Sequence, residues 1–223
     1  TMTANGDVNA TGGAVNFTAA NGITTAGDVT TAGTTVDYNS ATTQNGAVVI
    51  DTTNGFAGGA NVTFHDTVAG GQNLTIDGGT GGAVLFDNDS AVTVNNLTIA
   101  NAASVSVTGA LIANDLITTG NAYTVSLTGT GNTFAAHVDF LNTGAVTLGD
   151  ATADTFAFNG ALGFQGNAAS NAASTIDVTG DAHFGTGGVT LTDATLVRTT
   201  GNMVFGGDIA GGQDLTLDSG AVG

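Results

Sequence analysis

The sequence contains no cysteine, proline, tryptophan, lysine or glutamate, and these absences exclude several classes of protein. Without cysteine, the chain forms neither a disulfide framework nor a cysteine-based zinc cluster. Arg198 is the only arginine and there is no lysine, so the chain lacks the clustered cations that contact phosphate groups. Nucleic acids and anionic membrane surfaces are therefore excluded as partners. No apolar run approaches the roughly 18 residues of a membrane span, so we expect no membrane insertion.

The residues that are present favour strands and turns. The 18 acidic residues are all aspartate, and they give the chain a formal net charge of −17. Helix-favouring glutamate, lysine and arginine are missing or nearly so, whereas threonine, valine, asparagine and glycine abound. No apolar stripe with the period of a helix extends over a dozen residues. The composition therefore predicts an all-β protein.

Short apolar triplets, in which the outer two residues are apolar, recur along the whole chain. Each triplet predicts a short strand with alternate side chains on one face, and "NG", "GG", "TG" and "DG" turns separate the strands. The first residues of seven triplets recur at a nearly constant spacing: Val15, Val36, Val62, Val84, Val105, Val125 and Val146. This spacing indicates a structural repeat of about 21 residues, which is in the range of solenoid repeats.

A longer repeat contains the short one. Residues 61–82 match residues 202–223, most clearly where "VAGGQNLTIDGG" at 68–79 recurs as "IAGGQDLTLDSG" at 209–220. In that phrase we expect "AGGQ" to form a corner and the flanking apolar residues to point inward. The copies should lie about seven turns apart. Because the second copy stops in mid-repeat, we expect the chain to be a segment of a longer protein.

The two periods together predict a single-stranded parallel β-helix, or β-solenoid, over residues 1–223 as one continuous domain. Stacked turns of about 21 residues would bury one apolar column and pair each strand with its copy above and below. The length allows roughly ten to eleven turns. The missing prolines fit this fold, because every stacked strand uses its N–H groups in the ladder.

The Val-x-Phe triplets, the "GGAV" and "TGDV"-like turns and the richness in Gly, Asn, Thr and Asp resemble the repeats of large bacterial exoproteins. These include filamentous-haemagglutinin-like adhesins and autotransporter passengers. The resemblance covers essentially the whole chain and implies a right-handed β-helix, an extracellular or cell-surface location and a role in adhesion or in fibres. The loss of Lys and Glu departs from that family and leaves open calcium-dependent surface-layer or type I-secreted proteins.

Calcium is the one cofactor that the aspartates suggest. "DNDS" places Asp87 and Asp89 two residues apart in a turn, as at the start of a calcium loop, and Asp150 and Asp154 form a second loose pair. The alternative is that aspartate simply favours turns and keeps the rod soluble. No cofactor is required under that interpretation. Arg198 should form a surface ion pair with a nearby aspartate.

No enzymatic activity is predicted, because similar repeats leave no single turn set apart for catalysis. A polysaccharide-active β-helix would need cationic groups, as a base or to neutralise a uronate, or else paired carboxylates. Asp139, Asp150 and Asp154 are the candidates for the carboxylates. His65, His137 and His183 lie far apart and are interpreted as polar positions near strands.

Ice binding would need Thr-x-Thr at one fixed place in successive turns, and the sequence shows no such regular placement. The predicted function is a self-associating surface fibre, adhesin stalk or sheath. Its predicted partners are its own copies or the continuation of the same long chain, and cell-surface or matrix polysaccharide.

Overall fold

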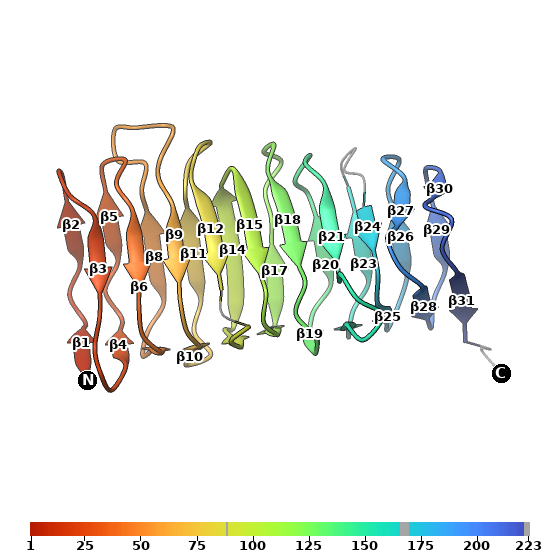
Figure 1. Ribbon diagram of the computed structural model, residues 1–223, viewed down its shortest axis with the longest axis horizontal. Helices are drawn as coiled ribbons and strands as arrows, with labels where there is room; N and C mark the ends of the chain where they lie inside the picture. Colours follow the sequence, from red (N-terminus) through yellow and green to blue (C-terminus); the bar gives the residue numbers. More distant parts are fainter. Residues whose placement is uncertain (88, 166–169, 221–223) are drawn as a thin grey trace.

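The chain forms a three-sided parallel β-solenoid of about ten turns, with roughly 21 residues in each turn. The computed structural model describes residues 1–87, 89–165 and 170–220. Over these ranges the chain contains no helix, and all pairings between its strands are parallel. Figure 1 shows the turns stacked along one axis from the N-terminus to the C-terminus. The predicted all-β solenoid is therefore confirmed.

Each turn contributes one strand to each of three faces, here named A, B and C. Face A is one sheet of β1 (Met2–Ala4), β4 (Ile23–Thr25), β7 (Thr42–Gln44), β10 (Val68–Ala69), β13 (Val92–Thr93), β16 (Leu111–Ala113), β19 (Asn132–Phe134), β22 (Thr155–Phe158), β25 (Thr175–Val178), β28 (Thr195–Thr199) and β31 (Leu215–Ser219). Face C is one sheet of β3 (Val15–Phe17), β6 (Val36–Tyr38), β9 (Val62–Phe64), β12 (Ala83–Phe86), β15 (Ser104–Val107), β18 (Thr124–Leu127), β21 (Val146–Leu148), β24 (Ser170–Ala172), β27 (Val189–Leu191) and β30 (Ile209–Ala210).

Face B is divided into two sheets. The first contains β2 (Val8–Ala10), β5 (Val29–Thr31), β8 (Val48–Asp51), β11 (Leu74–Asp77), β14 (Asn96–Asn101) and β17 (Asp115–Ile117). The second contains β20 (Val138–Phe140), β23 (Leu162–Phe164), β26 (Ala182–Phe184) and β29 (Met203–Phe205). Although β17 and β20 lie side by side, they do not share a regular ladder.

The core is a column of apolar side chains along the solenoid axis. On face C, the seven valines that defined the repeat pair in direct register from turn to turn, as the period predicts. Val125, for example, is 1% exposed between Val105 and Val146. Each such buried side chain contributes about 1.5–3 kcal/mol relative to leaving it in water.

Aromatic rings stack inside this column. On face C the ring centroids of successive turns lie 4.6, 4.5 and 5.0 Å apart, in the order Phe17, Tyr38, Phe64 and Phe86. A second stack on face B has spacings of 5.1, 5.3 and 4.8 Å, in the order Phe140, Phe164, Phe184 and Phe205. The spacing follows from the roughly 4.8 Å between neighbouring strands, which sets identical side chains face to face.

The two copies of the repeated phrase form the same corner. Gly70 and Gly71 have φ values of 115° and 61°, and their counterparts Gly211 and Gly212 have 117° and 63°. A Cβ atom on Gly70 or on Gly211 would lie 2.1 Å from a backbone oxygen of the preceding turn. Both corners therefore require glycine for conformation and for space.

The copies nevertheless lie on different faces of the solenoid. Strands β9, β10 and β11 belong to faces C, A and B, whereas their counterparts β29, β30 and β31 belong to faces B, C and A. The copies are therefore separated by twenty strands, or six and two-thirds turns, which agrees with the expected distance of about seven turns but is not a whole number of turns. The same stretch of sequence therefore builds different faces of the solenoid in its two copies. Residues 221–223 of the second copy lie outside the described residues.

Candidate functional site

The first predicted calcium pair makes contacts across turns. The carboxylate of Asp87 lies 3.0 Å from Nδ1 of His65, which is one turn earlier in the chain. Asp89 adopts a left-handed backbone with φ 52°, and its N–H donates to Oγ1 of Thr108 at 3.1 Å. Asn88 between them lies outside the described residues. The Asp87 carboxylate thus faces an imidazole of the neighbouring turn.

The second predicted pair closes a corner. Oδ2 of Asp154, which is 6% exposed, accepts the N–H groups of Asp150 at 2.9 Å and of Ala151 at 3.0 Å. Asp154 and Asp89 line one open hollow of about 410 Å³, which brings together one member of each predicted pair. Within the described ranges, no three His, Asp, Glu or Cys side chains converge to hold a metal ion. Calcium binding at the four aspartates stays a prediction.

The carboxylates considered for an enzyme are not neighbours. Asp139 lies in β20 on face B, whereas Asp150 and Asp154 lie at the corner between faces C and A. The structure therefore does not bring these three residues to one site.

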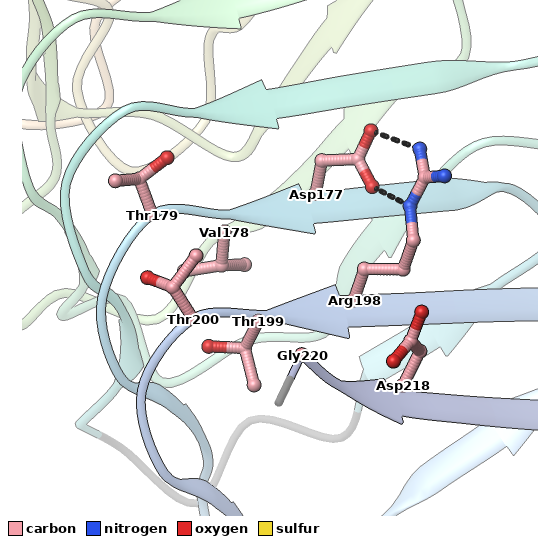
Figure 2. A pocket seen from close by; sticks show the side chains of 8 residues that line it. All are labelled: Asp177, Val178, Thr179, Arg198, Thr199, Thr200, Asp218 and Gly220. Atoms are coloured by element: carbon pink, nitrogen blue, oxygen red, sulfur yellow. Dashed lines mark hydrogen bonds and ion pairs between the residues drawn. The ribbon is translucent and has the colours of Figure 1, made fainter. Parts of the chain in front are cut away.

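The expected ion pair of Arg198 is present at the C-terminal part of face A. Asp177, Arg198 and Asp218 occupy directly paired positions of β25, β28 and β31. The guanidinium donates from Nε to Oδ1 of Asp177 at 2.5 Å and from Nη2 to Oδ2 at 2.6 Å (Figure 2). This bidentate contact, with Asp218 on the other side, raises the pKa of Arg198 above its usual value. The guanidinium group of Arg198 is therefore bound by the Asp177 carboxylate.

The ladder of face B is interrupted between β17 and β20 by a side chain. The hydroxyl group of Thr118, which is buried, donates to the carbonyl of Asp139 at 3.2 Å and accepts the N–H of Leu141 at 2.7 Å. The threonine thus replaces direct backbone pairing at this point. The interruption explains why face B consists of two sheets, and it sets one turn apart from the others.

A small hollow lies on the outer side of this interruption. We name it the β17–β20 hollow; it has a volume of about 170 Å³, and its walls are Asp115, Leu116, Ile117, Thr118, His137, Asp139 and Leu141. Nε2 of His137 lies 2.9 Å from Oδ1 of Asp139. Ile117 and Leu141 expose 37% and 41% of their surface. Carboxylates, an imidazole and aliphatic groups therefore meet at one place.

The two carboxylates of the β17–β20 hollow have different surroundings. A Cβ atom on Gly163 would lie 1.9 Å from Oδ1 of Asp139, so this carboxylate occupies the space that a side chain in β23 would take. Burial raises the pKa of Asp115 above its usual value, and the Asp139 charge adds to the rise, while the Leu116 N–H and His137 oppose it. Asp115 is therefore a partly desolvated carboxylate beside a second one.

Sequence reasoning missed this cluster because it treated His137 as isolated. The signal was available in the repeat length, since residues that are one repeat apart in the chain are neighbours in the stack. Asp115 and His137 are separated by one repeat, and the contacts between His65 and Asp87 and between Asp177 and Arg198 have the same kind of spacing. Charged or titratable residues that are one repeat length apart in the sequence therefore indicate contacts between neighbouring turns.

Comparisons with known proteins give no match to any family model, curated protein or solved structure. In the described part of the chain, no helix is long and apolar enough to cross a membrane.

Proposed function

We propose that this chain is a structural segment of an extracellular or cell-surface fibre, adhesin stalk or sheath. The observation that carries the proposal is the buried column, which runs through every turn from β3 to β28 with one strand-and-corner unit repeated throughout. A rod of stacked turns around one continuous core provides length and stiffness. Those are the properties that a stalk or fibre requires.

The same regularity supports growth and self-association. Because each turn pairs only with its neighbours, a further turn of the same kind, from the same chain or from another copy, would extend the three ladders without altering the core. The charge of −17 would keep rods apart except at uncharged or bridged contacts. Copies of the chain are therefore the proposed partners. Cell-surface or matrix polysaccharide is proposed as a further partner only because the repeats resemble those of exoprotein adhesins.

A calcium-dependent surface-layer or type I-secreted protein is the second candidate. The observation in its favour is that Asp51 and Asp77 are directly paired on neighbouring strands of face B. Carboxylates about 4.8 Å apart repel each other, and calcium with its oxygen ligands relieves such repulsion. The pair would bind calcium between turns or between rods.

Electron microscopy of the purified protein, with and without a calcium chelator, tests both candidates. We expect filaments or bundled rods that persist in chelator, because strand ladders and apolar stacking do not need metal. Filaments or sheets that dissolve in chelator would favour the calcium-dependent candidate. Single short rods under both conditions would contradict self-association.

A further inference from the structure

We propose that the β17–β20 hollow binds the primary ammonium group of a small amine or amino sugar. The proposal is independent of the fibre function, because it concerns one turn and not the repeat. Its basis is the meeting of Asp115, His137 and Asp139 at the only described interruption of a face, between two exposed aliphatic side chains.

The walls of the hollow carry a negative charge that favours binding of a cation. Two carboxylates face one imidazole, so the walls carry net negative charge whether His137 is neutral or protonated. The chain contains no lysine, and its one arginine is bound to Asp177 on face A. His137 already lies beside Asp139, so a cation that also reaches the Asp115 carboxylate must come from another molecule.

A primary ammonium fits these walls better than the alternatives. It is compact and has three N–H donors, which match carboxylate acceptors on two sides of the hollow. Ile117 and Leu141 offer aliphatic surface to the carbon frame that carries the nitrogen. Uronates and sulfated sugars would be repelled by Asp115 and Asp139.

The size of the hollow limits the ligand. Its volume of about 170 Å³ is below the roughly 300–1,000 Å³ of a pocket for a drug-sized molecule. It accommodates one ammonium group with a short stem, or one sugar residue of a longer glycan. Binding would also compensate the Asp115 carboxylate, whose pKa burial raises.

The aspartate pair on the unbroken part of face B provides a matched control. Asp51 and Asp77 are directly paired on β8 and β11, which form a regular ladder there. Asp115 and Asp139 lie on β17 and β20, which do not. Asp51→Asn therefore removes the same charge from the same face without altering the β17–β20 hollow. General attraction of amines to an acidic rod would respond equally to both substitutions.

The test is a titration of the isotope-labelled protein, followed by backbone amide NMR, with n-butylamine, glucosamine and N-acetylglucosamine. We expect butylamine and glucosamine to shift the amide signals of residues 115–118 and 137–141, and neutral N-acetylglucosamine to shift neither set. Asp139→Asn should weaken binding about five-fold, and Asp51→Asn should leave it unchanged. Asp115→Asn provides a second variant if the first alters the fold by circular dichroism.

The outcomes separate the two sources of the ammonium group. Binding of both amines supports a general ammonium site, and binding of glucosamine alone supports an amino sugar. Equal weakening by Asp139→Asn and Asp51→Asn, equal binding of N-acetylglucosamine, or shifts spread over all acidic positions would overturn the proposal.

Discussion

Phe64→Ala should destabilise the solenoid more than a substitution of the same residue type on its surface. The Phe64 ring is 2% exposed and stacks between Tyr38 at 4.5 Å and Phe86 at 5.0 Å. Removing a buried phenylalanine side chain costs about 3–5 kcal/mol, because transfer energy is lost and a cavity remains. The rings on both sides lose a stacking partner, so we expect the upper part of that range.

Phe56→Ala is the matched control. Phe56 lies on the loop between β8 and β9, which extends beyond the neighbouring corners in Figure 1, and it is 58% exposed. Its ring packs over Gly33, whose added Cβ would lie 3.2 Å from the ring. We expect a loss of about 1 kcal/mol or less.

The assay is urea unfolding followed by far-ultraviolet circular dichroism, combined with hydrogen exchange of individual amides. Solenoids unfold in parts, so exchange should accelerate most in the turns of β6, β9 and β12. A loss below about 1 kcal/mol for Phe64→Ala, or equal losses for the two variants, would refute the stacked-core reasoning.

Three further predictions concern the column, a corner and the aspartates. Val125→Asp places a charge in the core and should abolish the cooperative melting curve; an unchanged curve would contradict its inward position. Gly70→Ala, which meets backbone at φ 115°, should cost more in melting temperature than Gly71→Ala, whose Cβ finds open space at φ 61°. Asp77→Asn should stabilise by up to about 1 kcal/mol by relieving repulsion from Asp51, and the gain should disappear in high salt; a loss in low salt would argue against repulsion.

The strand positions could be predicted because they depend on local pattern. An apolar residue at every second position marks an inward face, and the spacing of Val15, Val36 and Val62 then gives the stack. The ion pair of Arg198 was predictable for a simpler reason, since 18 aspartates surround one arginine. These features need no knowledge of which face a strand occupies.

The outward columns were harder to predict, because turns vary in length and paired positions are therefore not separated by a constant number of residues. A threonine column runs along face A through Thr3, Thr24 and Thr43, but Ala69 interrupts it on β10. No Thr-x-Thr pattern marked it in the sequence, because each of these three-residue strands has only its middle side chain on the outer face. Thr25, which follows Thr24, is buried. The β17–β20 hollow was missed because His137 was considered without the residues one turn away, and the replacement of ladder bonds by the Thr118 hydroxyl group has no signal in the sequence.

The repeated phrase separates what the sequence determines from what the tertiary structure decides. By itself the sequence determined the strands, their inward residues and the glycine corners, because φ preference and alternation act within a few residues. Gly70 and Gly211 accordingly have nearly equal φ values. Only the stacked fold decided which face each copy occupies and which side chains meet across turns. That assignment depends on the number of strands between the copies, and twenty is not a multiple of three.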